Sequence, residues 1–229
     1  VFPKPIVHGF QTSEHCKKRS TIVILKNFDE FTEIFAKINP RTFHYSGFFL
    51  FVLINGEILE VGQMFELLWS IQIFNVNVIF EDENHEILMK TFMPFSDGKC
   101  DVTTPVLVGK FKEGNFRSKN LFPEKMKNLH KCPVRVSISS SADPFVIIKQ
   151  HSNGSQILSG DNINLITALA ESLNFRLNFT FVGNEGYFLD NGTSEGPLRA
   201  LKDNEADLSI SNWWLKPNRL NFFDVTESY

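Results

Sequence analysis

The sequence predicts an α/β protein in two parts, and three observations lead to this prediction. Short apolar runs of strand length alternate with stretches whose apolar residues recur every three or four positions, as in amphipathic helices. A stretch rich in Pro, Lys and Asn, residues 120–133, separates two such halves. The length, 229 residues, suits one large or two modest domains. We therefore expect residues 1–125 and residues 132–229 to form two α/β regions.

In the first half, strands are predicted where apolar residues run together and helices where they step by three and four. The expected order is strand 20–25, helix 28–38, strand 46–54, helix 58–68, strand 74–80 and strand 86–95. Such a βαβ order predicts strands that are buried on both faces and connected by helices packed on the sheet.

The second half repeats the alternation. A strand is expected at 132–139, then a hairpin that turns at "SNGS", and then a helix over 163–173 that Asp161 or Asn162 is suited to cap. Another strand follows at 175–182. A short helix with Pro197 in its first turn leads to a last strand at 207–211 and an aromatic loop.

Composition excludes several classes of function. A net charge of -3 gives no electrostatic argument for nucleic acid or an anionic membrane. The longest apolar run, 48–54, is far shorter than a membrane-spanning helix, and the first residues do not resemble a secretory signal. No nucleotide, metal-ligand or nucleophile motif is present, so we expect no enzyme, no cofactor and no metal site.

The cysteines and the glycosylation sequons bear on location. Of three cysteines, Cys100 and Cys132 could form a disulfide around a loop, but Cys16 is equally available and free thiols are the other alternative. Sequons occur at Asn153, Asn178 and Asn191. They are about as frequent as composition alone predicts, so they are only compatible with an extracellular, glycosylated protein.

The aromatic end of the chain carries the strongest candidate for a ligand contact. Arg219 could hold a carboxylate with two parallel hydrogen bonds, or it could be a surface arginine paired with Asp224. Trp213 and Trp214 could be core rings or the wall of a small-ligand pocket. Neighbours in an extended chain point in opposite directions, so one pocket would receive one of the two rings.

These segments carry a family resemblance. "CPVRVSISSSADPFVIIKQ", "GDNINLITALAESLNFRLNF" and "GPLRALKDNEADLSISNWWLKPNRLNFFDVTESY" together resemble the first segment of the ligand-binding domain of ionotropic glutamate receptors. Chemosensory ionotropic receptors of arthropods are more similar still. The resemblance covers residues 132–229 and implies lobe 1 of a periplasmic-binding-protein-like clamshell. Looser similarity of "LLWSIQIFNVNVIF" and "KTFMPFSDGKC" implies a divergent amino-terminal extracellular region over 1–125.

The resemblance also implies site residues. Arg219 matches the arginine that holds the ligand carboxylate in this family, and Phe145 matches an aromatic residue that covers the ligand. Where relatives have Pro-Leu-Thr, this chain has Asn212, Trp213 and Trp214. An indole donates one hydrogen bond and accepts none, unlike the threonine hydroxyl. We therefore expect an odorant or tastant, such as an organic acid or amine, rather than glutamate.

The whole receptor implied by the resemblance is a multi-pass plasma-membrane subunit of a cation channel that acts in olfaction or taste. "DVTESY" matches the sequence just before the first membrane helix, so this piece is expected to be extracellular and to lack the pore. Co-receptor subunits would complete a tetramer. The alternatives are a soluble solute-binding protein or decoy fragment of the same lobe, and an enzyme on a related scaffold, for which no nucleophile or acid–base pair was found.

Overall fold

The computed structural model divides into two compact units, Val1–Lys127 and Asn128–Tyr229, and the division lies within the stretch predicted to separate two halves. Each unit is described by itself. The structure describes residues 18–38, 43–117, 120–139, 143–150, 156–183, 186–189, 192–210, 219, 222 and 223. Together they show the expected α/β class, with parallel and antiparallel strands.

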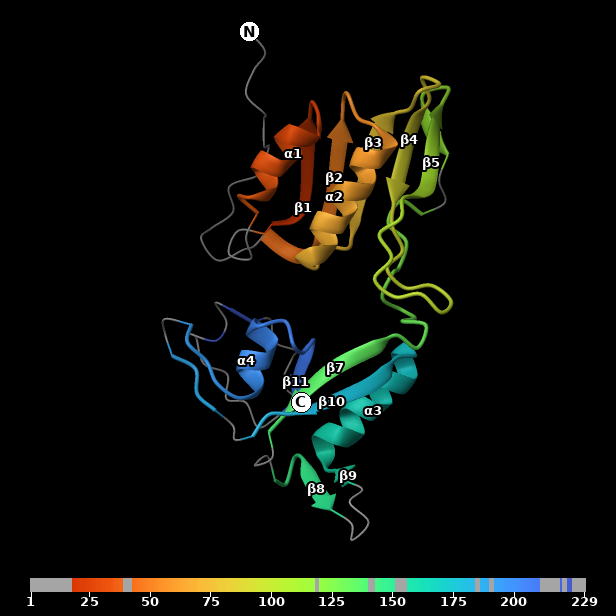
Figure 1. The fold of residues 1–229 in the computed structure, drawn as a ribbon. Coiled ribbons are helices and arrows are strands. Elements are labelled where there is room, and N and C mark those ends of the chain that lie inside the picture. The colour runs from red at the N-terminus through yellow and green to blue at the C-terminus, as the bar shows by residue number, and fades with distance from the viewer. Residues whose placement is uncertain are drawn as a thin grey trace. The chain divides into compact units, whose positions relative to one another are not determined.

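The first unit is a mixed six-stranded sheet whose strands lie in chain order (Figure 1). The first three strands are parallel and the last three are added antiparallel. Its elements are β1 (Lys18–Leu25), α1 (Phe28–Phe35), β2 (Phe43–Leu53), α2 (Ile58–Ser70), β3 (Val76–Glu81), β4 (Ile87–Thr91), β5 (Val106–Lys112) and β6 (Asn115–Arg117). The hairpin of β5 and β6 was not predicted from the sequence.

Both helices of this unit cover the same face of the sheet, and the core lies beneath them (Figure 1). Phe31 of α1 is fully buried, and its ring meets Phe51 of β2 edge-on with centroids 5.5 Å apart. From α2, Phe65 and Leu68 are also fully buried. The three-and-four spacing of apolar residues therefore predicted both helices. It was wrong at two ends: α1 ends at Phe35, before Ile38, and Ile58, the first residue of α2, is 46% exposed.

The opposite face of this sheet differs from the prediction. Alternate residues of β1 and β2 point away from the helices, and Ile22, Ile24 and Phe48 are 59%, 55% and 47% exposed. The ring of Phe122, from the stretch before the second unit, packs on Phe48 with centroids 4.9 Å apart. The prediction that these strands are buried on both faces was therefore wrong for Ile22, Ile24 and Phe48.

The first helix begins at a side-chain cap. The Asn27 side chain accepts a hydrogen bond from the Glu30 backbone N–H at 3.2 Å. We expect Asn27→Ala to lower the free energy of unfolding of the first unit by about 1 kcal/mol, because that N–H loses its partner. Urea unfolding followed by NMR signals of Val23 measures it. Asn27→Asp keeps the acceptor and is the control; an equal loss in both variants would exclude the cap as the cause.

The second unit contains a three-stranded parallel sheet in the order β10-β7-β11 and a separate hairpin of β8 and β9. Its elements are β7 (Pro133–Ile138), β8 (Ile147–Gln150), β9 (Gln156–Ser159), α3 (Asp161–Leu173), β10 (Arg176–Phe181), α4 (Pro197–Lys202) and β11 (Leu208–Ile210). All were predicted from the sequence. The expected cap of α3 was wrong, because Gly160 precedes the helix and Asp161 lies in its first turn.

The two helices of this sheet lie on opposite faces. Val136 and Ile138 of the central strand pack with Ile163 and Ile166 of α3. Between them, Ser137 points to the other face, where its hydroxyl donates to the carbonyl of Pro197 at the start of α4. Alternate residues of a strand point to opposite faces, so the unit is doubly wound. Among the described residues, no helix is long and apolar enough to cross a membrane.

Residues 120–133, the stretch between the two halves, include buried side chains that its linker-like composition did not suggest. Lys125 is only 4% exposed, and its Nζ donates at 2.6 Å to the Phe74 carbonyl. Leu129 is 6% exposed, and its N–H donates to the carbonyl of Leu173 at the end of α3. Residues on both sides of the unit boundary are therefore parts of their own unit rather than a solvated tether.

Candidate functional site

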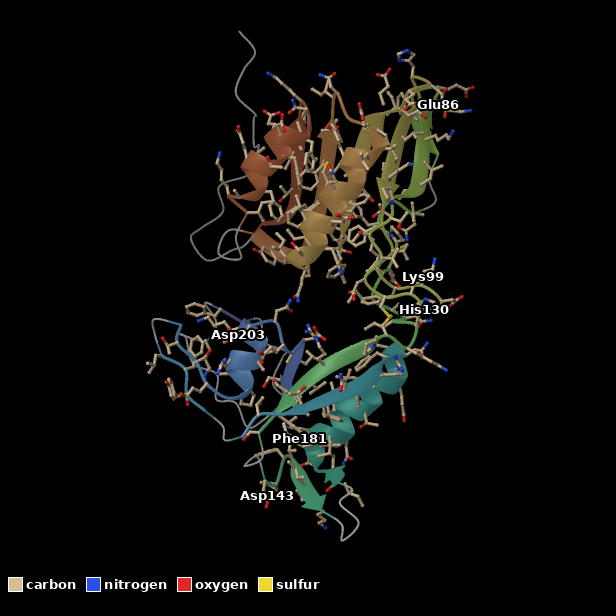
Figure 2. The ribbon with its side chains drawn as sticks, viewed as in Figure 1. Glu86, Lys99, His130, Asp143, Phe181 and Asp203 are labelled. Atoms are coloured by element: carbon tan, nitrogen blue, oxygen red, sulfur yellow. The ribbon has the colours of Figure 1, made fainter. Side chains whose placement is uncertain are left out.

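The second unit offers a position for a ligand at the carboxyl ends of its parallel strands. After β7 the chain leads to α3 on one face of the sheet, and after β10 it leads to α4 on the other. The strand order therefore reverses between β7 and β11, and α/β proteins bind ligands at such a reversal, outside the carboxyl ends of the strands. Phe181, labelled in Figure 2, ends β10 at this edge and is 41% exposed.

Phe145 lies in the connection that follows β7, before the hairpin. Its side chain is partly buried, and its carbonyl accepts the Asn162 N–H of α3 at 3.1 Å. Gly160 makes this approach possible, since a Cβ there would lie 2.4 Å from that carbonyl oxygen. The predicted aromatic residue is thus fixed by its backbone between β7 and α3.

Arg219 lies in a turn that follows β11. Its side chain is partly buried, with Nε shielded from solvent, and its carbonyl accepts the N–H groups of Phe222 and Phe223 at 3.0 Å each. The rings of Phe222 and Phe223 pack against Phe188, which comes from the connection after β10. Among the described residues, the structure therefore joins Arg219 to this connection rather than to Phe145.

The charges beside this loop are of both signs. The Glu195 carboxylate raises the pKa of Tyr187, first by its negative charge and then by a hydrogen bond. On α4, the Lys202 ammonium donates to the Gly192 carbonyl at 2.7 Å. The connection after β10 therefore already contains the Glu195 carboxylate, and Lys202 is hydrogen-bonded to the Gly192 carbonyl of the same connection. A bound anion would have the Arg219 guanidinium as its main positively charged partner.

An ion pair fixes the strand that leads to Arg219. Arg135 of β7 and Asp207, the residue before β11, are joined by a 2.6 Å contact between Nη2 and Oδ1 and a 3.2 Å contact between Nε and Oδ2. Nη1 of the same guanidinium donates to the Asn204 carbonyl at 2.6 Å. These contacts of the Arg135 side chain attach the turn after α4 to the central strand, β7. They were not predicted from the sequence.

Several predicted site residues lie outside the described part of the chain. These are Asn212, Trp213 and Trp214 of the ligand set and Asn153 and Asn191 of the sequons. Cys100 and Cys132 are both disulfide-bonded in the structure, whereas Cys16 lies outside the described residues. Cys100–Cys132 therefore remains the proposed pair.

The remaining sequon, at Asn178, lies on an exposed strand. Asn178 and Thr180 of β10 are both exposed, on the face opposite α3. We expect Asn178 to carry a glycan in the chain secreted from insect cells, because the acceptor amide is accessible in the folded protein. Glycopeptide mass spectrometry measures it, with Thr180→Ser as the control that keeps the sequon and Thr180→Ala as the variant that destroys it. An unmodified Asn178 peptide in the secreted chain would contradict this expectation.

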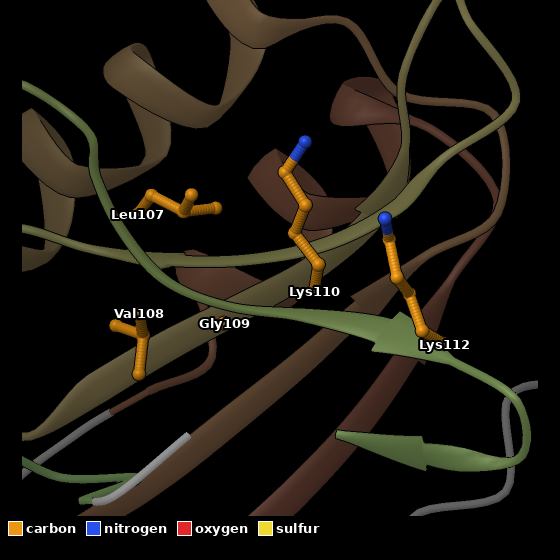
Figure 3. Close-up of a pocket in the computed structure, with 5 residues that line it drawn as sticks. All are labelled: Leu107, Val108, Gly109, Lys110 and Lys112. Atoms are coloured by element: carbon orange, nitrogen blue, oxygen red, sulfur yellow. The ribbon is translucent and has the colours of Figure 1, made fainter. Parts of the chain in front are cut away.

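A shallow pocket of about 350 Å³ lies on the first unit along β5 (Figure 3). Lys110 and Lys112 extend to the same side of this strand, and Glu86 raises the pKa of Lys110 by a hydrogen bond. The register with β4 shifts here, leaving Val108 as an extra residue. The short strand β6 pairs only with Lys110–Lys112, so residues 106–109 of β5 have no strand beyond them in the described sheet. Lysines and a bulge are features with which proteins protect such an edge, so we place no ligand site there.

The described residues hold no group of three His, Cys, Asp or Glu side chains that could bind a metal ion. The residues around Arg219 that sequence analysis missed are Phe188, Gly192, Lys202 and Phe222. Only the glycine could have been noticed, as a turn residue in "NGT". The others act through contacts between segments that are distant in the sequence.

A doubly wound α/β unit with a cationic side chain beyond its parallel strands is an architecture that small-ligand-binding domains use. Comparison with known families agrees. Residues 5–128 match a family model for the ligand binding domain of ionotropic receptors, and residues 133–229 match a model for the ligated ion channel L-glutamate- and glycine-binding site. The first match covers more than half of the chain, which therefore belongs to the ionotropic receptor family. No curated protein matches the chain.

Family membership settles the coarse function. The chain is of the ligand-binding, extracellular kind found in ligand-gated ion channels, which are receptors that assemble as multimers. Its fold is of the periplasmic-binding-protein-like α/β class that such domains share. The ligand is expected to be a small molecule.

Proposed function

We propose that this chain is the extracellular ligand-sensing part of a chemosensory cation-channel subunit, and that it detects an odorant or tastant rather than glutamate. In this proposal, residues 1–125 are a divergent amino-terminal region and residues 132–229 are lobe 1 of the ligand clamshell. The full receptor lies in the plasma membrane and assembles with co-receptor subunits in a tetramer.

The observation that carries the proposal is the Arg219 turn. Three aromatic rings hold it against the connection that follows β10, and its guanidinium is partly buried. A guanidinium presents two parallel donors that match a carboxylate, and partial burial strengthens such a pair relative to one in water. These features support an organic acid as the ligand.

The sequence next to this turn argues against an amino acid. Asn212, Trp213 and Trp214 replace a Pro-Leu-Thr stretch whose carbonyl and hydroxyl hold the ammonium group in amino-acid receptors. Without that hydroxyl acceptor, a ligand ammonium group would lose a hydrogen bond on binding, which is unfavourable once it is desolvated. A carboxylate without an amino group avoids that loss.

The proposed mechanism is closure of the clamshell around the ligand. A ligand can favour the closed state only by binding it more tightly than the open state. Arg219 would hold the ligand on lobe 1 while lobe 2 supplies the additional contacts of the closed state. The movement would then be transmitted through the segment after Tyr229 to the channel.

Ligand preference tests this proposal. Butyrate, butyramide, butylamine and L-glutamate are titrated separately into the 229-residue chain, and binding is followed by amide chemical shifts of the second unit. We expect butyrate to bind more tightly than L-glutamate and butyramide. If L-glutamate binds at least as tightly as butyrate, the proposed ligand class is wrong.

The soluble alternative is distinguished by the transcript. A stop codon directly after Tyr229 would favour a solute-binding protein or decoy, whereas three hydrophobic spans and a second lobe segment downstream would favour the channel subunit.

A further inference from the structure

We propose that Phe188, Gly192 and Phe222 are positioning residues for Arg219. Together with Phe223, the two phenylalanines form an aromatic clasp, defined here as the rings of Phe188, Phe222 and Phe223, that fixes where the guanidinium stands. The inference deepens the proposed function and rests on it for the ligand, but the clasp consists of contacts within the chain itself.

The first step is the turn. Because the Arg219 carbonyl accepts both the Phe222 and the Phe223 N–H, each at 3.0 Å, the backbone folds back within four residues. Any displacement of the two rings is therefore passed directly to the Arg219 backbone. Arg219 itself has helical backbone and lies beyond the end of β11, so the pairing of β11 with β7 does not by itself position it.

The second step is the contact with the connection after β10. Phe188 is only 9% exposed, and its ring meets Phe222 and Phe223 with centroids 5.2 and 5.4 Å away and interplanar angles of 67° and 65°. Edge-to-face geometry is the favoured arrangement for such pairs. A single ring from one segment thus holds both rings of the other.

The third step is the fit of Gly192. A Cβ at this position would lie 2.8 Å from Cε1 of Phe222. The backbone φ of Gly192 is +83°, a value that residues other than glycine rarely adopt. The Gly192 N–H donates to the Leu189 carbonyl at 2.9 Å, and the Gly192 carbonyl accepts from Lys202 of α4 at 2.7 Å. The surface on which Phe222 rests is thus fixed to a helix.

The connection itself is shaped like a hairpin around Phe188. Leu189 donates its N–H to the Thr193 carbonyl at 2.9 Å, and Glu195 donates to the Tyr187 carbonyl at 3.0 Å. Phe188 and Ser194 form an isolated antiparallel bridge between these two bonds. The ring of Phe188 therefore projects from a backbone held on both sides, as a positioning residue requires.

The consequence is that this connection sets the specificity of Arg219. A variant of the connection would move the guanidinium without removing it. The affinity for a carboxylate would then change, while the affinity for an uncharged analogue would stay the same. A residue that only stabilised the fold would affect both kinds of ligand equally.

The first test uses the ligand-free 229-residue chain and the Nε–H signals of its arginine side chains, with the Arg219 signal identified by its loss in Arg219→Met. Phe188→Leu and Gly192→Ala are expected to shift the Arg219 signal. Leu169→Ala, which changes an exposed leucine of α3 in the same unit, is the control and should leave it in place. If Phe188→Leu disturbs the amide signals of β7 and α3, Phe222→Leu replaces it, because Phe222 is 44% exposed. An unshifted Arg219 signal in a folded variant overturns the proposal.

The second test is a double-mutant cycle with butyrate as the probe. Phe188→Leu is expected to weaken butyrate binding by about tenfold in the wild-type background and to have no further effect in Arg219→Met. Equal losses in both backgrounds overturn the positioning role. If wild-type chain does not bind butyrate, the proposed ligand class fails, and the Nε–H signals alone decide for or against the clasp.

Discussion

Arg219→Met is expected to lower the affinity of the 229-residue chain for butyrate by about 100-fold. The methionine fills a similar volume but provides no donor, so the carboxylate would be desolvated beside an apolar side chain. Arg219→Lys keeps the charge and loses the planar pair of donors, so an intermediate loss of about tenfold is expected. Isothermal titration calorimetry measures both.

Arg199→Met is the matched control for this experiment. Arg199 belongs to the same unit, but its side chain is 62% exposed and pairs with Asp203 at 3.0 Å. Its replacement changes the net charge by the same amount and should leave butyrate affinity within about twofold. Equal losses in the Arg199 and Arg219 variants would show that the effect is one of general charge, and would remove Arg219 from the site.

A second large effect is expected from Lys125 on the pH dependence of stability. Burial lowers the pKa of Lys125 from 10.5 to about 7. Its Nζ donates to the Phe74 carbonyl and the Thr91 hydroxyl at 2.6 Å each and stands 4.4 Å from the centre of the Phe92 ring. All these partners are neutral, so no negative charge offsets the burial of the ammonium.

The direction in which stability changes with pH follows from which state of the chain, folded or unfolded, binds the Lys125 proton. Between about pH 7 and about pH 10 the unfolded chain holds this proton and the folded chain does not, so the free energy of unfolding rises with pH. The first unit is expected to be more stable at about pH 9 than at about pH 7 by roughly 2 kcal/mol from this group. Below pH 7 both states are protonated and the contribution becomes constant.

Lys125→Met removes this titration and should abolish the rise. Urea unfolding at the two pH values, followed by methyl signals of Ile73 and Val78, reports on the first unit alone. Lys127→Met is the control, because Lys127 lies two residues away and its side chain is 81% exposed. If Lys125→Met keeps the same rise as wild type, the buried lysine is not its source.

The sequence predicted most elements because their signals are local. Phe28, Phe31 and Phe35 step along one helical face, and Pro197 stands in the first turn of a short helix. Both signals are complete within a few residues. The fold class and both units could therefore be predicted without knowledge of any contact between distant segments.

The remaining features depend on contacts that a linear pattern does not contain. Lys125 lies in a stretch with the composition of a linker, and its burial depends on Phe74 and Thr91. The exposure of Ile22 and Ile24 depends on which face of β1 the helices cover. Likewise, the resemblance predicted Arg219, but its place relative to Phe188 depends on how the connections after β10 and β11 meet.

The central claim, that Arg219 holds a ligand carboxylate, is tested most directly by the Arg219 Nε–H signal of the wild-type chain during titration. Butyrate is expected to shift this signal in a saturable manner, with the same half-saturation concentration as the amide signals of the second unit. Butyramide, which has the same shape and no charge, should leave it unchanged. Saturable binding of butyrate without any movement of the Arg219 signal would contradict the assignment.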